Sequence, residues 1–352
     1  MTQQRHADLV RSGLSRRDAL KRAGLGAGVA AGLGLGGGLA LPGATRGATA
    51  TQGTARKVVF VNHDNNPFFV PVRKGLEQFA AMAGWETQFT GPAVGDTVQT
   101  VELQRQAIAS QPDAVGFTRI DTTSFDENIR EAQRQGIFVI LFNTESEGYQ
   151  DLGVAFVGQR HQAAAEVGGY ECARNAQELT GKTEGKVVMG IIQPGHSALE
   201  ARHRGYEAGI ARYNEENGTS YTTEALETST DGAKSIAAQQ AKFAAEGDQI
   251  VAFAHADFGH QFTAQFIREN GLQGRFANGG FDLLPDVLTA IKSGEAQWTV
   301  GQNPFAQGWV TSALIHMNLE NGYEPSDHII GADLVTTENI DAVMEREAQF
   351  AE

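Results

Sequence analysis

Cysteine is nearly absent from this sequence: Cys172 is the single one among 352 residues. One cysteine cannot form a disulfide within the chain, and none lies near residue 50, where a lipid-anchored exported protein would need one. Cys172 stands in the apolar stretch "AAAEVGGYECA" and is expected to be a buried helix residue. We therefore expect neither a disulfide framework nor a lipid anchor.

Positive charge is also scarce once the first 50 residues are set aside. The chain holds 28 Lys and Arg against 42 Asp and Glu, for a formal net charge of −14. Seven of the basic and two of the acidic residues fall in the first 50 positions, so the remainder carries about −19. Nucleic-acid phosphates require a basic face, so this surface argues against a nucleic-acid partner.

Motifs that would indicate catalysis, a cofactor or a metal are missing. The stretch "GHSAL", residues 195–199, lacks the second glycine of a nucleophile elbow, and no phosphate-binding G-x-x-x-x-G-K-[ST] occurs. No H-E-x-x-H or Cys/His spacing is present, and four histidines fall on separate predicted elements: His196, His203, His255 and His260. The sequence predicts no enzyme, no cofactor and no metal site.

The first 50 residues have the order of an export signal. Arg16 and Arg17 stand in the stretch Ser15 to Lys21, a glycine-rich apolar run follows, and "ATA" closes it at residues 48–50. This resembles a twin-arginine signal peptide; a basic tail with a glycine linker is the alternative. Residues 32–37 also spell G-x-G-x-x-G, but no strand precedes them, so a dinucleotide site is not expected.

From residue 57 onward short apolar runs alternate with segments of helical spacing. With 41% apolar and 20% charged residues, the chain is long enough for two domains of ordinary size. The apolar runs are 57–61, 114–117, 137–142, 186–192, 250–254, 275–281 and 297–301, and two clear helical segments are 72–84 and 125–136. This alternation predicts an α/β fold with two doubly wound parallel-sheet lobes and a hinge of several crossovers. We expect one lobe from residues 57–158 with about 303–328, and the other from 159–302 with about 329–352.

Polar side chains follow almost every predicted strand. Ligands of parallel sheets bind at the carboxyl ends of strands, so these residues are candidate contacts: Asn66, Asn143, Arg204, His255, Asp282 and Gln302. Paired donors and acceptors suit a polyhydroxylated ligand, because a sugar hydroxyl both donates and accepts. In "NNPFF", residues 65–69, Phe68 and Phe69 add rings that could cover the apolar face of a sugar.

Each candidate also has a structural interpretation. Phe68 and Phe69 could form a hydrophobic staple at a helix start. Arg204 could be a surface helix residue, and Asp282 could cap the helix of "LLPDVLTAIKSG". His255 is predicted as a wall residue of the pocket.

Several stretches resemble the type I periplasmic sugar-binding proteins of ATP-driven (ABC) importers, the ribose-binding group and its simple-sugar relatives. They are "VVFVNHDNNPFF", "DAVGFTRIDTTSFDENIREAQRQGIFVILFN", "VAFVGQ", "ARHRGYEAGI", "NGGFDLLPDVLTAIKSG" and "VGQNPFAQGW". The resemblance implies sugar contacts at Asn66, Phe68, Phe69, Arg204, Asp282 and Gln302. Two positions depart from the ribose binders: Asn143 and Thr144 replace an Asp-Arg pair, and Ala256 replaces an Asn, with His255 before it.

The resemblance implies a periplasmic or extracytoplasmic monomer that closes around a monosaccharide, deoxysugar or sugar alcohol. It also implies a membrane permease as the partner. A non-sugar solute such as a nucleoside or an autoinducer-like molecule is the alternative ligand. A chemotaxis or signalling partner is the alternative to the permease.

Overall fold

The structure, a computed structural model, describes residues 55–350, which form two six-stranded sheets. The predicted twin-arginine signal of residues 1–50 lies outside them. The order in sheet A is β11-β5-β4-β3-β1-β2, and in sheet B it is β12-β10-β9-β8-β6-β7. The strands of sheet A are β1 (Lys57–Val61), β2 (Glu86–Thr90), β3 (Ala114–Phe117), β4 (Phe138–Asn143), β5 (Phe156–Gly158) and β11 (His328–Ile329). The strands of sheet B are β6 (Glu184–Ile191), β7 (Ser220–Glu227), β8 (Ile250–His255), β9 (Ala277–Phe281), β10 (Trp298–Gly301) and β12 (Asp333–Thr336).

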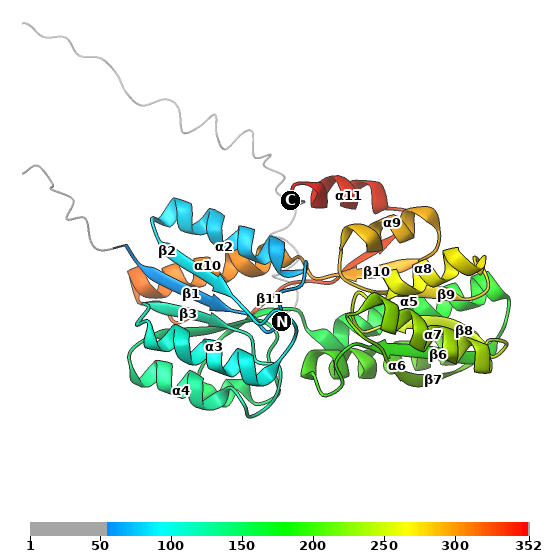
Figure 1. Ribbon diagram of the computed structural model, residues 1–352, viewed down its shortest axis with the longest axis horizontal. Coiled ribbons are helices and arrows are strands. Elements are labelled where there is room, and N and C mark those ends of the chain that lie inside the picture. Colours follow the sequence, from blue (N-terminus) through cyan, green and yellow to red (C-terminus); the bar gives the residue numbers. More distant parts are fainter. Residues whose placement is uncertain (1–54, 351–352) are drawn as a thin grey trace, which may run out of the picture. The chain divides into compact units, whose positions relative to one another are not determined.

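Sheet A and the helices on its two faces make up the N-lobe (Figure 1). These helices are α2 (Phe69–Ala83), α3 (Thr97–Ala109), α4 (Asp126–Arg134) and α10 (Pro304–Asn321), with a short 3₁₀ turn at Tyr149–Leu152. Strand β1 shows why both faces are covered: Val58 and Phe60 pack toward α2 and α10, whereas Val59 and Val61 pack toward α3 and α4. A strand buried on both faces reads as an unbroken apolar run.

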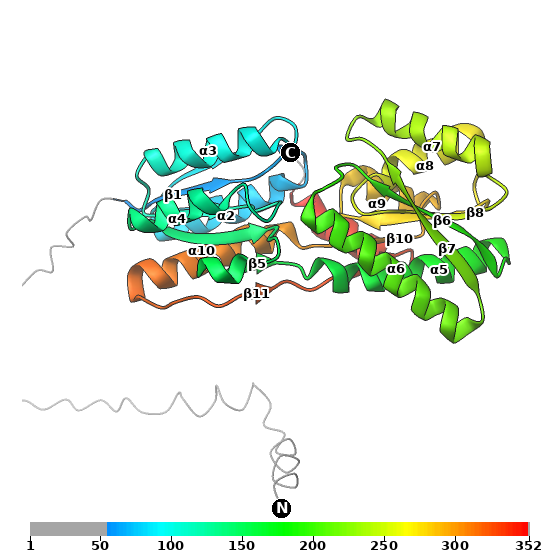
Figure 2. The ribbon, with the colours of Figure 1, turned by 90° about the horizontal axis from the view of Figure 1, so that it is seen from below.

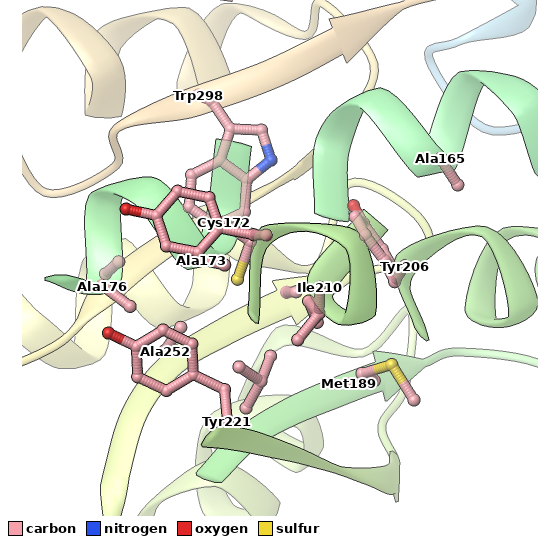
Figure 3. Packing of buried hydrophobic residues seen from close by; sticks show 14 of the residues in the cluster. Ala165, Cys172, Ala173, Ala176, Met189, Tyr206, Ile210, Tyr221, Ala252 and Trp298 are labelled. Atoms are coloured by element: carbon pink, nitrogen blue, oxygen red, sulfur yellow. The ribbon is translucent and has the colours of Figure 1, made fainter. Parts of the chain in front are cut away.

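Sheet B and its helices make up the C-lobe, with α5 and α6 on one face (Figures 1 and 2). The helices are α5 (His161–Thr180), α6 (Ser197–Asn217), α7 (Gly232–Glu246), α8 (His260–Asn270), α9 (Pro285–Ser293) and α11 (Ile340–Ala348). Figure 3 shows the core under α5 and α6, where Cys172, Tyr206 and Trp298 pack together. Cys172 is fully buried, as the sequence predicts, and burial raises the pKa of its thiol.

Helices that cover a common face approach closely because glycines remove the side chain at the contact. A Cβ on Gly308 of α10 would lie 2.0 Å from the Val72 carbonyl oxygen of α2. A Cβ on Gly209 of α6 would lie 2.2 Å from the Glu166 carbonyl oxygen of α5. Any larger residue at these positions would force the helices apart.

The chain passes between the two lobes three times. The passages lie between β5 and α5, between β10 and α10, and between β11 and β12. Helix α10 thus completes the N-lobe after most of the C-lobe has been built, and α11 returns to the C-lobe, against α9. Connections of a few residues that absorb rotation are the usual construction of a hinge.

The predicted fold class is confirmed, with one addition. The strands pair in parallel except for β12, which pairs antiparallel with β10 at the edge of sheet B. No helix within residues 55–350 combines the length and apolar character that crossing a bilayer demands.

Candidate functional site

A small polar cavity lies where the N-lobe and C-lobe meet. Its volume is about 60 Å³, and residues from both lobes line it. The N-lobe contributes His63, Asp64, Asn66, Phe68, Phe69, Asn143 and Thr144; the C-lobe contributes Ile192, Gln193, His196, Ala198, Leu199, Arg202, Asp257, Phe258 and Asp282, and Gln302 comes from the passage between β10 and α10. We call it the polar cavity. Six of the eight sequence-predicted residues line it: Asn66, Phe68, Phe69, Asn143, Asp282 and Gln302.

The N-lobe wall of the polar cavity is built from the loop after β1 and the start of α2. The Asn66 side-chain oxygen accepts the Phe68 backbone N–H at 3.0 Å, which fixes the turn that presents both rings. Phe68 and Phe69 meet edge to face with centroids 5.1 Å apart. Both rings also belong to the N-lobe core, so their packing role and their place on the cavity wall coexist.

Two strand ends at the site hold a backbone conformation that side chains seldom adopt. Asn143 at the end of β4 has φ 63°, and Asp282 directly after β9 has φ 78°. Asn and Asp tolerate the left-handed region better than other residues, because their short polar side chains bond locally. The Asn143 amide donates to Gln307 Oε1 at 3.1 Å, and Gln307 donates in turn to the Gln302 carbonyl oxygen at 3.2 Å. Gln307, which the sequence did not single out, therefore joins the N-lobe strand end to the passage beside the cavity.

The C-lobe wall carries a buried guanidinium between carboxylates. Arg202 lies over the Phe281 ring, with Cζ 3.9 Å from the centroid, and donates to the Ala256 carbonyl oxygen at 2.8 Å. Asp257 accepts the backbone N–H groups of Gly259 at 2.7 Å and Ile192 at 3.0 Å, yet burial raises its pKa to about 7. Burial also raises the pKa of Asp282, whereas the charge of Arg202 opposes that shift.

The predicted contact residue Arg204 is replaced in the structure by Arg202, two positions earlier on α6. Arg204 is exposed on α6 and does not line the polar cavity, whereas Arg202 is 4% exposed and does. Arg202 lies three residues before Gly205, which packs against α5, so it shares the inward face of α6. A helical-face analysis of "ARHRG" would have favoured Arg202.

The prediction of His255 as a pocket wall residue is also corrected. His255 is fully buried behind the site, and its Nε2 lies 2.8 Å from the Thr263 hydroxyl of α8. Strand β8 extends through His255, one residue beyond the predicted run, so the side chain stays in the layer between sheet and helix. Asp257, two residues later, takes the place on the cavity wall.

Asp282 does not cap the following helix. Helix α9 begins after Leu284, with no side-chain cap, and a carboxylate oxygen of Asp282 instead accepts the Gln302 side-chain amide. The capping interpretation is therefore wrong, and Asp282 and Gln302 form one hydrogen-bonded unit on the cavity wall.

Two histidines from opposite lobes meet at the cavity. His63 Nε2 and His196 Nε2 are 3.3 Å apart, and both rings are buried. His196 Nδ1 accepts the Ala198 backbone N–H, so we assign its proton to Nε2, which then donates to His63. Burial lowers the pKa of His63 to about 3 and lowers the pKa of His196 as well. The lobes also touch beside this pair, where the Ser197 N–H donates to the Ile120 carbonyl oxygen at 3.0 Å.

Three polar atoms of cavity-lining residues have no partner among the described residues. They are His63 Nδ1, Arg202 Nε and Gln302 Oε1. With the tautomers assigned above, two are donors and one is an acceptor. A buried polar atom without a partner costs about 1–3 kcal/mol, so an external hydrogen-bonding group that reached these atoms would stabilise the site. Within residues 55–350, no three His, Cys, Asp or Glu side chains lie close enough to share a metal ion.

Comparison with known proteins identifies the family of this chain. Residues 57–323 match the periplasmic binding protein domain family. The xylose/arabinose-binding protein of Sulfolobus acidocaldarius is 25% identical over 300 residues, covering 81% of this chain and 72% of that protein.

Two solved structures share the fold. One is an ABC transporter solute-binding protein from Agrobacterium vitis with bound α-D-tagatopyranose, at 22% identity and a TM-score of 0.73, covering 84% of this chain and 100% of that chain. The other is an ABC transporter solute-binding protein from Burkholderia graminis in complex with D-arabinose, at 21% identity and a TM-score of 0.72, covering 81% and 96%. The chain described here belongs to the periplasmic binding protein family.

Proposed function

We propose that this protein captures a monosaccharide or sugar alcohol between its two lobes and delivers it to an ABC permease. The observation that carries the proposal is the polar cavity, where unpartnered donors and an unpartnered acceptor stand beside two phenyl rings. A pyranose or polyol satisfies such a set, because each hydroxyl both donates and accepts, while its C–H face packs on an aromatic ring. The sugars bound by the relatives support the same class of ligand.

The size of the cavity supports a small solute. A volume of about 60 Å³ corresponds to roughly four to six water positions. A pyranose has about twice as many non-hydrogen atoms, so a sugar ring seated between the lobes holds them further apart than they are in this structure. We expect this separation to come from rotation at the three passages.

In the proposed mechanism the ligand stabilises the closed form because it contacts both lobes. Asn66, Phe68, Phe69 and Asn143 hold it from the N-lobe, and Arg202, Asp257, Asp282 and Gln302 hold it from the C-lobe side. A ligand shifts a conformational equilibrium only by its difference in affinity for the two states, and contacts on both sides exist only when the lobes are closed. The closed form then presents both lobes to the permease.

The proposal includes the compartment in which the protein acts. The protein acts outside the cytoplasm after export, and the twin-arginine motif at Arg16 and Arg17 is the proposed route. It acts as a monomer without a lipid anchor, a cofactor or a metal. A chemotaxis or signalling protein is the alternative partner.

A thermal-shift screen of residues 51–352 tests the ligand class. The panel contains pentoses, hexoses, deoxysugars, sugar alcohols and inositols, with nucleosides and amino acids as controls. A ligand at 100 times its dissociation constant stabilises the protein by about 2.7 kcal/mol, a clear shift in Tm. We expect a response to one class of sugar or polyol that disappears in Asp282→Ala. A response to a nucleoside alone would contradict the sugar assignment and leave the binding fold in place.

A further inference from the structure

A second cavity, of about 610 Å³, lies beside the polar cavity and is walled by both lobes. The N-lobe side consists of the loop after β1, the first turns of α2 and Phe89 at the end of β2. The C-lobe side consists of residues 283–285, 288 and 289 and the end of α11, and Phe350, which follows α11, completes the wall. We call it the apolar cavity.

The walls of this cavity are mainly hydrocarbon. Phe69 and Phe89 face it from the N-lobe, and Leu283, Leu288 and Met344 face it from the C-lobe. The cavity is a cleft that is partly open to solvent, and its apolar lining, more than its volume, sets it apart from an ordinary surface groove. An apolar pocket with a few polar groups at its margin is the usual form of a small-molecule site.

The apolar and polar cavities share a wall. Asn66 and Phe69 line both of them. Across from these residues, Asp282 faces the polar cavity while its neighbour Leu283 faces the apolar one. The two cavities are therefore adjacent, and a single molecule could reach both if Asn66 and Phe69 left room for it between the lobes.

The end of the described chain is already seated on the wall of the apolar cavity. The Phe350 ring stacks on Phe305 of α10, with centroids 5.1 Å apart, and the Phe350 carbonyl oxygen accepts the Lys74 ammonium at 3.1 Å. These contacts hold Phe350 against the N-lobe, so its ring forms part of the cavity wall and does not fill the cavity.

We propose that the solute is amphipathic: its sugar ring occupies the polar cavity, and an alkyl or aryl group attached to one of its oxygens occupies the apolar cavity. This inference rests on the proposed function and narrows the substrate class from free sugars to glycosides. Each lobe supplies apolar side chains to the second cavity, so the attached group adds contacts that exist only in the closed form.

A glycoside series measures this contribution directly. The probes are D-xylose, D-arabinose, D-glucose and D-galactose, each with its methyl, n-butyl and phenyl glycosides in both anomers. Dissociation constants are measured by calorimetry. Each buried methylene should tighten binding by about fourfold, so an n-butyl glycoside of the preferred sugar should bind at least tenfold more tightly than the methyl glycoside.

A matched pair of variants locates the effect. Ala348→Trp places a large ring at the wall of the apolar cavity, whereas Ala342→Trp makes the same substitution on α11 away from it; both alanines are exposed, so neither change disturbs the core. The butyl advantage should persist in Ala342→Trp and disappear in Ala348→Trp, with the affinity for the free sugar retained in both.

The outcomes separate the two proposals. If a free sugar binds and its butyl and phenyl glycosides bind no more tightly, the amphipathic assignment is overturned and the sugar assignment stands. An unchanged butyl advantage in Ala348→Trp would also overturn it. If no sugar or polyol of the thermal-shift panel binds and no glycoside binds, the proposed function fails and this inference fails with it.

Discussion

The two lobes share a strand order but present different chemistry to the polar cavity. In each sheet the second strand in sequence lies at one edge, the first lies beside it, and the others follow in order toward the opposite edge. On this common frame the N-lobe offers mainly phenyl rings and amides, from Phe68, Phe69, Asn66 and Asn143, with one carboxylate, Asp64, and the C-lobe has one phenyl ring on the wall, Phe258. The C-lobe offers a guanidinium with two carboxylates, from Arg202, Asp257 and Asp282. Recognition thus resides in residues at the ends of strands and not in the topology.

This difference suggests how much each lobe contributes to the affinity for the ligand. Rings and amides adapt to many sugars, whereas a buried charge cluster demands a defined set of hydrogen bonds. Changes in the C-lobe wall should therefore cost more affinity than changes in the N-lobe wall.

Removing the guanidinium should have the largest effect. Arg202→Ala deletes the unpartnered donor and leaves Asp257 and Asp282 without their positive neighbour, so we expect a loss of about 2–5 kcal/mol, or at least about 30-fold in affinity. Arg204→Ala is the matched control, two positions away on the same helix and exposed, and should change binding by less than about 0.5 kcal/mol. Calorimetry with the ligand from the screen measures both. Equal losses in the two variants would contradict the assignment of Arg202.

The histidine pair tests the contact between the lobes. Closed lobes hold His63 and His196 neutral with lowered pKa values. In separated lobes we expect both rings to face water and their pKa values to return toward about 6.5. The closed form therefore binds fewer protons, its advantage is full above about pH 7, and it is lost as the pH falls. We expect each histidine to weaken ligand binding by about 30-fold at pH 5.

His63→Gln separates this effect from the other titrating groups nearby. His161 and Asp64 also lie near the pair, and Asp257 has a raised pKa of about 7, so the wild-type profile is a sum. Glutamine still accepts from His196 but does not titrate, so the variant should lose about 30-fold less affinity than the wild type between pH 7 and pH 5. Superimposable pH profiles would rule out the pair as the source.

The N-lobe rings should give the smallest effect. Phe68→Leu keeps an apolar side chain but removes the aromatic face, so we expect a loss of about 1 kcal/mol, or roughly fivefold in affinity. Phe79→Leu, on the helix that follows Phe68 but not on the cavity wall, controls for core packing. It should lower Tm comparably without changing the dissociation constant. A loss in Phe68→Leu as large as that in Arg202→Ala would break the proposed division between the lobes.

The central strands could be predicted from the sequence because both of their faces are buried. Strands β1, β3 and β8 are unbroken apolar runs and were found. Strands β2 and β7 lie at the sheet edges and are only partly buried, so "ETQFT" and "SYTTEALE" carry no such run and were not predicted. The antiparallel strand β12 pairs with β10 because the chain returns to the C-lobe after β11, and no local sequence pattern indicates that return.

The sequence predicts a site residue correctly where the end of a strand determines its place at the cavity. It fails where the direction of the side chain around a helix determines whether the residue reaches the cavity. Asn143 is the last residue of β4, Asp282 directly follows β9 and Asn66 lies in the loop after β1, so the ends of these strands place them at the cavity. Arg202 and Arg204 differ by about 200° around a helix, and the packing of α6 on α5 selects between them. His63 and His196 are in contact only because the two lobes are in contact. No single stretch of the sequence indicates that contact.

The three passages between lobes have a consequence for biosynthesis. The N-lobe lacks α10 and β11 until residue 329 has been made, so its sheet cannot be completed while the ribosome is still adding the C-lobe. Neither lobe is a continuous stretch of polypeptide: a truncation between β10 and α10 would leave both unfinished, and one between β11 and β12 would still leave the C-lobe without β12 and α11. A nascent chain of this protein must therefore wait for nearly its full length before either half reaches its final packing.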